Sequence, residues 1–225
     1  MSYYALIPAA GSGQRAAAAA PKQYAPLCGR PMLWHAVRAV CVPPVQTVFV
    51  VLAPGDRKFA EYDWSAFDGK LEPLYCGGET RRDSVYNGLV SAMAALDADD
   101  WVLVHDAARP CLPAADLEKL VQEAQEDEVG GILALPVAET VKTGLHGRIE
   151  STAERSRLWL AQTPQMFRAG LLMQALQRAK QVTDEAAAVE QLGLKPRLVQ
   201  GSRENLKVTW PEDLAIAEGI LRRRA

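Results

Sequence analysis

Two glycines and two basic residues near the amino terminus have the types and spacing needed to bind phosphate. Gly11 and Gly13 follow residues 3–7, an apolar run typical of a buried first strand, and Arg15 and Lys22 come shortly after them. Glycine permits positive φ angles and a close approach of backbone N–H groups to a ligand, while the cations add positive charge. The pattern indicates a polyphosphate cradle. A tight turn with two solvated charges explains the glycines equally well, because short Gly-x-Gly patterns are common.

Three further segments place glycine or polar residues where a predicted strand ends or the chain turns. Residues 77–84 combine two glycines with acidic and hydroxyl side chains, residues 105–109 contain an acid and a base expected at one rim, and residues 205–209 contain a lysine. Open α/β sheets bind ligands at the carboxyl ends of their strands. One such segment is weak support for a site, but four from distant parts of the chain indicate a composite site.

Strand and helix patterns alternate along most of the chain. Continuous apolar and β-branched runs are typical of buried parallel strands, and apolar residues at helical spacing predict helices. Strands are expected at residues 3–7, 47–52, 71–76, 101–105, 131–136 and 197–200, with a short extended segment at 206–209, and helices at residues 30–40, 85–93, 117–124, 168–180, 184–192 and 211–224. Thr183 is expected to cap the helix that follows it. The alternation predicts an α/β fold, a Rossmann-like doubly wound, mostly parallel sheet in a single domain over residues 1–225.

The alternation breaks between residues 137 and 157. Residues 137–144 alternate in extended fashion, a turn falls near Gly147, and residues 148–152 are predicted to form the returning strand. This protruding β-hairpin arm has too few apolar residues for a core of its own. It must therefore pack on the main domain or on a second subunit, and the pattern alone leaves both alternatives open.

The composition of the chain argues against several classes of binding partner. The net charge is −2, so neither a general nucleic-acid binder nor a membrane-surface binder is expected, because either usually carries a strong basic excess. No apolar run is long enough to span a bilayer and the amino terminus lacks a secretory pattern, which favours a soluble, cytoplasmic protein. The four cysteines are scattered without a Cys-x-x-Cys pair, so neither a zinc site nor a disulfide framework is expected.

Eight short motifs, in order over nearly the whole chain, resemble those of the 2-C-methyl-D-erythritol 4-phosphate cytidylyltransferase family. They are Pro8 to Arg15, Pro21 to Tyr24, Gly77 to Val85, His105 to Pro110, Glu154 to Trp159, Gln162 to Gln165, Thr183 to Ala186 and Lys207 to Leu214. Any one of them alone is weak, whereas the set is highly specific. The resemblance implies the third step of the non-mevalonate isoprenoid pathway, in which the phosphate of methylerythritol phosphate attacks the α-phosphorus of CTP and releases pyrophosphate.

The resemblance also implies roles for individual residues. The implied catalytic residues are Arg15, Lys22, Arg155 and Lys207, of which the first two would stabilise charge in the transition state. The implied CTP contacts, many of them through the backbone, are Pro8, Ala9, Ala10, Gly11, Ser12, Gly13, Gly77, Gly78, Glu79, Asp83 and Ser84. The implied acceptor contacts are Asp106, Arg109, Thr140, Arg155 and Lys207. Mg2+ would bridge the triphosphate oxygens, with Asp106 either near the metal or on the acceptor hydroxyls.

In this family the arm crosses into a partner subunit. The resemblance therefore implies a homodimer formed by arm exchange, in which Thr140 and Arg155 complete the neighbour's site. Two features depart from the family pattern: Gln14 stands where a second arginine often appears beside Arg15, and alanine occupies positions 16–20. The alanines form either one helical turn around the ligand or a mobile lid, and helix propensity does not decide between these, because five residues are too few for a stable helix.

Three other functions are compatible with parts of the pattern. A related cytidylyltransferase that uses ribitol 5-phosphate as acceptor would share the CTP-binding segments. A sugar-1-phosphate nucleotidyltransferase shares the glycine-rich start but fits residues 105–110 and the arm arginine less well. A nucleotide-binding regulatory protein would bind CTP and release no pyrophosphate.

Overall fold

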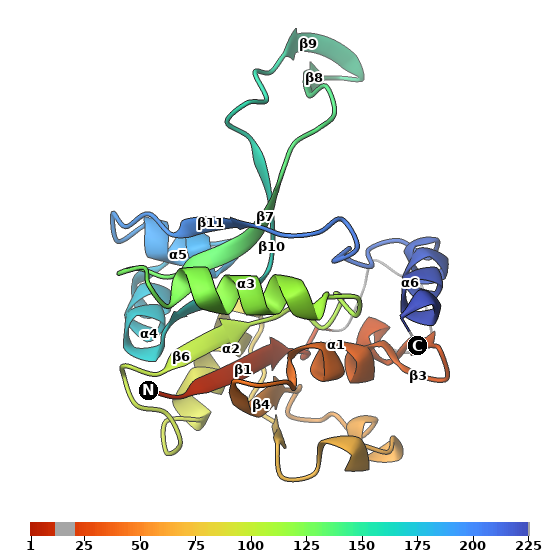
Figure 1. Cartoon of the computed structure of the whole chain (residues 1–225), viewed down its shortest axis with the longest axis vertical. Helices are drawn as coiled ribbons and strands as arrows, with labels where there is room; N and C mark the ends of the chain where they lie inside the picture. The colour runs from red at the N-terminus through yellow and green to blue at the C-terminus, as the bar shows by residue number, and fades with distance from the viewer. Residues whose placement is uncertain (12–20, 225) are drawn as a thin grey trace.

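The apolar runs of the chain form one central sheet of seven strands in the computed structural model, which describes residues 1–11 and 21–224 (Figure 1). The strands, in spatial order, are β11 (Arg197–Gln200), β7 (Gly131–Pro136), β10 (Trp159–Arg168), β6 (Trp101–Val104), β1 (Tyr3–Pro8), β4 (Val45–Val51) and β5 (Leu71–Leu74). β10 runs antiparallel to β6 and β7, whereas the other neighbouring strands of the sheet are parallel. The prediction of a doubly wound, mostly parallel sheet is confirmed.

Helices cover both faces of the sheet, because alternate residues of the central strands are apolar on both sides. In β1, Ala5 and Ile7 belong to one core cluster, and Tyr4 and Leu6 belong to another on the opposite face. The first cluster includes residues of α1 (Met32–Val40) and α3 (Ala114–Ala124), and the second includes residues of α2 (Arg81–Ser91), α4 (Ala169–Arg178) and α5 (Glu185–Glu190). Two helical layers therefore hold the strand ends in fixed positions.

Shorter elements surround this framework. They are the 3-10 helices η1 (Lys22–Tyr24), η2 (Phe59–Glu61) and η3 (Ser65–Phe67), the small hairpin of β2 (Pro26–Leu27) and β3 (Arg30–Pro31), and the last helix, α6 (Asp213–Arg223). A third core cluster joins α6 to the β2–β3 hairpin and to Val208. No helix among residues 1–11 and 21–224 is both long and apolar enough to cross a membrane.

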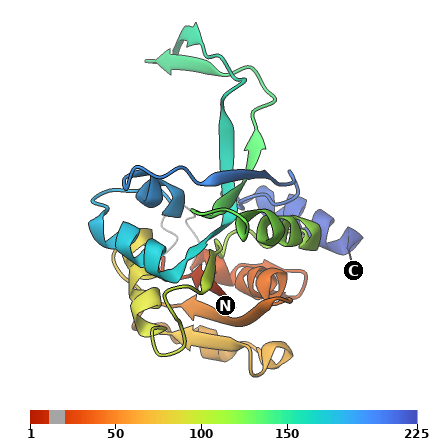
Figure 2. The same cartoon turned by 60° about the vertical axis from the view of Figure 1, so that its left-hand side comes forward.

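The arm rises from the sheet as a separate hairpin (Figures 1 and 2). Its strands are β8 (Lys142–Leu145) and β9 (Arg148–Thr152), joined by a turn in which His146 and Gly147 have φ angles of 50° and 75°. Every residue of both strands is exposed. The run expected to be extended over residues 137–144 forms a regular strand only from Lys142, while the Val137 N–H donates to the Leu158 carbonyl and the Ala153 N–H donates to the Val141 carbonyl nearer the base of the arm.

One local prediction needs correction. The side chain of Asp184, rather than Thr183, caps α5, by accepting a hydrogen bond from the Ala187 N–H at 2.9 Å. Residues 206–209, expected to be a short extended segment, belong to no regular element, and the Val208 N–H donates to the Ala108 carbonyl at 2.8 Å, which ties this segment to the end of β6. That contact brings the final motif beside the strand ends where the site is expected.

Candidate active site

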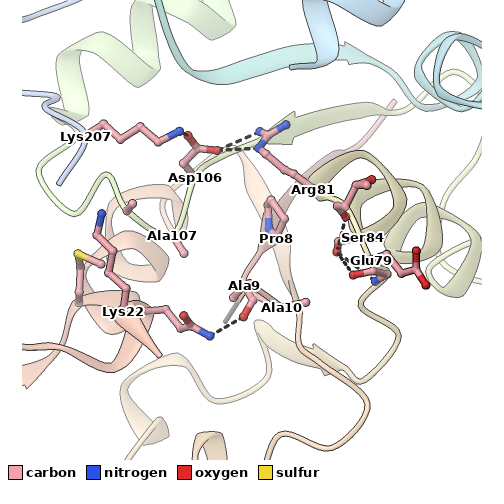
Figure 3. Close-up of a pocket in the computed structure, with 16 residues that line it drawn as sticks. Pro8, Ala9, Ala10, Lys22, Glu79, Arg81, Ser84, Asp106, Ala107 and Lys207 are labelled. Atoms are coloured by element: carbon pink, nitrogen blue, oxygen red, sulfur yellow. Dashed lines mark hydrogen bonds and ion pairs between the residues drawn. The ribbon is translucent and has the colours of Figure 1, made fainter. Parts of the chain in front are cut away.

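A cavity of about 450 Å³ lies at the carboxyl ends of β1 and β6 (Figure 3). The strand order reverses around β1, and such a point is where open α/β sheets bind ligands. Predicted site residues that line the cavity are Pro8, Ala9, Ala10, Gly11, Lys22, Gly78, Glu79, Ser84, Asp106 and Lys207. The structure thus brings together the four segments that the sequence singled out.

The first wall of the cavity is the end of β1 with the turn that carries Lys22. The buried Gln23 side chain donates from Nε2 to the Ala9 carbonyl at 2.7 Å, which fastens this turn to the strand end. The next residue, Tyr24, donates its hydroxyl to Asp56 at 2.8 Å and holds the other side of the turn. In Figure 3 the Lys22 side chain rises along one side of the cavity toward the loop that carries Ala107. Its positive charge therefore lies at the cavity wall.

The second wall is the segment before α2. A Cβ atom on Gly77 would lie 2.2 Å from the Ala10 Cβ and 2.8 Å from the Leu52 carbonyl oxygen, so glycine alone permits the close approach of this segment to the end of β1. The Ser84 hydroxyl accepts from the Gly78 N–H at 3.1 Å and donates to the Thr80 carbonyl at 3.0 Å. These bonds fix the backbone around Gly78 against the first turn of the helix.

A chain of four charged side chains crosses the back of the cavity. Asp106 accepts from Arg81 Nε at 3.0 Å and from Lys207 Nζ at 2.7 Å, one cation on each carboxylate oxygen. Arg81 also donates from its two terminal nitrogens to Glu185, at 2.6 Å and 3.0 Å. Burial alone would raise the pKa of Asp106, but Arg81 and Lys207 outweigh that effect and hold it well below the usual range. Asp106 is therefore a carboxylate at neutral pH.

A buried histidine shapes the loop that carries Asp106. The Thr163 hydroxyl accepts from the Asp106 N–H at 3.0 Å and lies 3.1 Å from His105 Nδ1, while His105 Nε2 lies 3.0 Å from the Arg109 carbonyl. The carbonyl can only accept, so Nε2 carries the proton and Nδ1 accepts from Thr163. Burial lowers the pKa of His105 to about 4, which makes it a neutral structural group rather than a proton carrier at pH 7.

Several predicted site residues lie elsewhere. Arg109 is buried and donates to the Asn205 and Ala161 carbonyls at 2.6 Å and 3.3 Å, lining a second cavity of about 310 Å³ at the base of the arm. Gly77 and Asp83 do not line the first cavity. Thr140 and Arg155 lie on the arm, where Arg155 donates to the Ala138 carbonyl. The predicted residues that fall outside the described parts of the chain are Ser12, Gly13, Gln14, Arg15 and the alanines at 16–20.

Two contributors to the cavity were not singled out by the sequence as site residues. Gln23 and Arg81 both line it, and each makes the contacts described above. Arg81 is the first residue of α2, where the helix dipole disfavours a cation. A basic residue at that position is a usable signal, because it indicates that the side chain has a partner outside its own helix.

The side chains that line the cavity also determine how a metal ion could be bound there. Among the described residues no three His, Cys, Asp or Glu side chains come together as a cation site. Asp106 is an ionised carboxylate of the cavity wall, and both of its oxygens already contact cationic side chains. Glu79 also lines the cavity, so the described residues offer two carboxylates there, Asp106 and Glu79. This limited set fits a cation such as Mg2+ that keeps several waters and takes most of its other ligands from substrate phosphates.

Known proteins resemble this chain over its whole length. The family model described as IspD, 2-C-methyl-D-erythritol 4-phosphate cytidylyltransferase, matches residues 3–223. A protein of that name from Dechloromonas aromatica (strain RCB) is 56% identical over 225 residues, covering 99% of this chain and 98% of the relative. Both matches therefore extend over nearly the whole chain.

Solved structures share the fold as well as the sequence. A crystal structure of 4-diphosphocytidyl-2C-methyl-D-erythritol synthase is 42% identical, with a TM-score of 0.86, and the match covers 98% of each chain. The Francisella tularensis 2-C-methyl-D-erythritol 4-phosphate cytidylyltransferase (IspD) is 36% identical, with a TM-score of 0.83, and the match covers 98% of this chain and 100% of that one. The chain belongs to the 2-C-methyl-D-erythritol 4-phosphate cytidylyltransferase (IspD) family.

Proposed function

We propose that this chain, as one nucleotidyltransferase domain, transfers a cytidylyl group from CTP to 2-C-methyl-D-erythritol 4-phosphate. The products are 4-diphosphocytidyl-2-C-methyl-D-erythritol and pyrophosphate, in non-mevalonate isoprenoid biosynthesis. The observation that carries the proposal is the convergence of Lys22, Arg81 and Lys207 with the ionised Asp106 around one cavity. Membership of the family supports the identity of both substrates.

The transfer needs no protein nucleophile. An ionised oxygen of the acceptor phosphate forms a bond to the α-phosphorus of CTP, the bond from that phosphorus to the bridging oxygen breaks, and pyrophosphate leaves with the electron pair. Negative charge on the phosphoryl oxygens must be neutralised in the transition state, and the reacting atoms must be aligned. We assign neutralisation of this charge to Lys22, which lines the cavity, together with Arg15.

Two sides of the cavity suit the two substrates differently. Residues 8–11, Gly78 and Ser84, here called the nucleotide wall, present backbone groups and a hydroxyl, which suits a nucleotide recognised through its base and ribose. On the opposite side, Asp106 can accept hydrogen bonds from acceptor hydroxyls. Lys207, half-exposed at 49%, can move from Asp106 to an incoming phosphate. Glu79 lines the nucleotide side of the cavity. The resemblance to the family is the basis on which Asp83, Gly77 and Arg109 are proposed as ligand contacts.

We also propose Mg2+ as the cofactor. The cation would be held mainly by CTP phosphate oxygens and waters, with Asp106, one of the carboxylates of the cavity wall, as the proposed protein ligand. When bound, it would neutralise charge on the triphosphate. This chain's own residues supply the rest: Lys22 contributes a further positive charge, and the backbone of residues 8–11 shapes the nucleotide wall.

The arm supports a homodimer in which each subunit completes the other's site. Nothing in β8 or β9 is buried, and Leu145 and Ile149 expose 57% and 68% of their surface. An isolated two-stranded hairpin is marginally stable in water, so a second surface is expected to cover it. On this proposal Thr140 and Arg155 reach the partner's acceptor side, which explains why neither lines the cavity of its own chain.

A pyrophosphate-release assay tests the proposed function. Release is expected only when CTP, Mg2+ and methylerythritol phosphate are present together, and it should be lost when a chelator removes the metal. Ribitol 5-phosphate, tested in parallel at the same concentration, should react far more slowly. A strong preference for ribitol 5-phosphate, or CTP binding without turnover, contradicts the proposal.

A further inference from the structure

Glu185 is a fully buried carboxylate that pairs with one cationic side chain, Arg81. Only 1% of the Glu185 side chain is exposed, and both of its oxygens accept from Arg81, at 2.6 Å and 3.0 Å. Arg81 in turn donates to Asp106, which also contacts Lys207. The four charges therefore alternate in sign from the interior to the cavity, and Glu185 is the interior end of the chain (Figure 3 shows the other three).

The element that carries Glu185 does not depend on it for its own structure. The Asp184 side chain caps the amino terminus of α5. Gln165 of β10 holds this cap in place, because its side chain donates to the Asp184 carboxylate at 2.9 Å and accepts from the Ala186 N–H at 2.8 Å. Buried residues such as Val189 pack the helix against the core. Glu185 is thus an additional group, held rigidly at the first residue of a helix that is fastened by other contacts.

A buried ion pair is weak grounds for a stabilising role, because removing two charges from water costs about as much as their attraction returns. The position of this pair instead suggests a role at the cavity. Two parallel hydrogen bonds fix the plane of the Arg81 guanidinium, so that its Nε–H meets Asp106 from a defined direction. Without the Glu185 charge, Arg81 would have one anion left, Asp106, and would draw that carboxylate away from Lys207.

We infer that Glu185 is a positioning residue for the transfer reaction: through Arg81 it holds the Asp106 carboxylate where the acceptor binds. This inference rests on the proposed function, because it assigns Glu185 an effect on the acceptor side of that reaction. Glu185 touches no substrate itself. Its effect should therefore fall on the acceptor more than on CTP.

The test compares Glu185→Gln with Glu190→Gln. Both substitutions remove one carboxylate charge from α5, but Glu190 is exposed. Steady-state pyrophosphate release at saturating CTP gives kcat/KM for methylerythritol phosphate, and calorimetry gives the Kd of CTP. Glu185→Gln is expected to lower kcat/KM for the acceptor by about tenfold or more, because a small misplacement of a positioning group has effects of this size. The Kd of CTP should change by less than about threefold, and Glu190→Gln should match the wild type.

Two results overturn the inference: a Glu185→Gln variant that matches Glu190→Gln, or one that loses CTP affinity as much as it loses acceptor kcat/KM. The second result would indicate a general structural role. A wild-type chain that releases no pyrophosphate contradicts the proposed function instead. An active wild type with an unaffected Glu185→Gln variant contradicts only the role of Glu185.

A second pair of variants decides the matter if Glu185→Gln does not fold. Arg81→Ala leaves the Glu185 carboxylate buried without its partner, and adding Glu185→Gln removes that charge, so the double variant should unfold at a higher temperature than Arg81→Ala alone. If Glu185 acts through Arg81, the two variants should have equal kcat/KM for the acceptor. A further loss of about tenfold in the double variant overturns the inference.

Discussion

The cavity and the arm differ in what holds their charged side chains in place. In the cavity wall, Asp106 contacts two cations at 3.0 Å or less, and its loop is fixed by a buried histidine and threonine. On the arm, Arg155 donates to the carbonyl of Ala138, seventeen residues away in the same hairpin, and its side chain is exposed. The cavity residues are held by contacts within the chain, whereas on the proposed function the arm residues act at a second subunit.

The largest effect is expected in the cavity, from Lys22→Ala. Removing a cation aimed at developing phosphoryl charge should lower kcat by about 10²–10³-fold. The Kd of CTP should rise by less than about tenfold, because the backbone contacts of the nucleotide wall remain. Single-turnover kinetics and calorimetry measure the two quantities separately. Lys180→Ala, which removes the same charge from an exposed position, is the control and should leave both unchanged. Equal losses in kcat and CTP affinity would assign Lys22 to binding alone.

The second-largest effect is expected from Arg155→Ala, which tests whether the arm acts on the site of a second subunit. Arg155→Ala should lower kcat/KM for methylerythritol phosphate by about 10- to 100-fold, because a cation near the acceptor phosphate is lost. Coexpression of the Arg155→Ala and Lys22→Ala chains should then restore activity. A mixed dimer has one site with Lys22 from one subunit and Arg155 from the other. Random pairing therefore predicts about a quarter of the wild-type rate.

Arg157→Ala provides the matched control for the arm. It removes the same charge two residues away on the same exposed segment, and its activity should match the wild type. The coexpression result distinguishes the two arrangements directly. If each arm served its own subunit, both chains of the mixed dimer would lack one required residue, and the mixture would stay as inactive as its components.

The sequence predicted the cavity better than it predicted the links behind it. Glycine, aspartate and lysine at strand ends can be recognised from the local sequence. The strand-helix alternation then predicts that those strand ends lie together. Arg81 and Glu185 are 104 residues apart, and no local pattern pairs them. The sequence analysis also predicted no strand at β10. Buried polar residues such as Gln162 and Thr163 interrupt the apolar pattern by which a strand is predicted. These polar residues serve the neighbouring loop rather than the sheet.

The arm shows the opposite limit. Its hairpin was expected from a turn and two extended runs, and both the turn near Gly147 and the returning strand Arg148–Thr152 are confirmed. What the arm packs against could not be predicted, because that depends on a surface that the local pattern does not describe. The pattern left the main domain and a second subunit equally open, and only the resemblance to a family favoured the partner subunit; this part stays a prediction.

A smaller effect is expected from the pH dependence of the cavity loop. The pKa of His105 falls to about 4 in the folded chain, below the 6.5 of an unfolded histidine, so the unfolded chain binds the proton more readily. Stability due to this residue is present above pH 6.5 and is lost as the pH falls toward 4. Between pH 7.5 and 5 the free energy of unfolding should fall by about 2 kcal/mol from His105 alone.

Urea titrations of the wild type and of His105→Gln measure this difference, since the other buried histidine, His35, titrates in both chains. The variant should be less stable at pH 7.5 but should lose less stability on acidification. His146→Gln, a change in the exposed turn of the arm, should keep the wild-type dependence on pH. Parallel curves for the wild type and His105→Gln would show that His105 is not held neutral by the loop.

The smallest effect is expected at the arm itself, from Ile149→Ser in protein dilute enough to be monomeric. Ile149 exposes 68% of its surface, whereas Ile132 of β7 exposes 5%. Ile149→Ser should therefore change the free energy of unfolding by less than about 0.5 kcal/mol, and Ile132→Ser should lower it by several kcal/mol. At concentrations where dimers form, Ile149→Ser should weaken association in sedimentation experiments. A loss above about 1 kcal/mol in the dilute monomer would instead mean that the arm folds back on its own subunit, and the contrast between cavity and arm would fail.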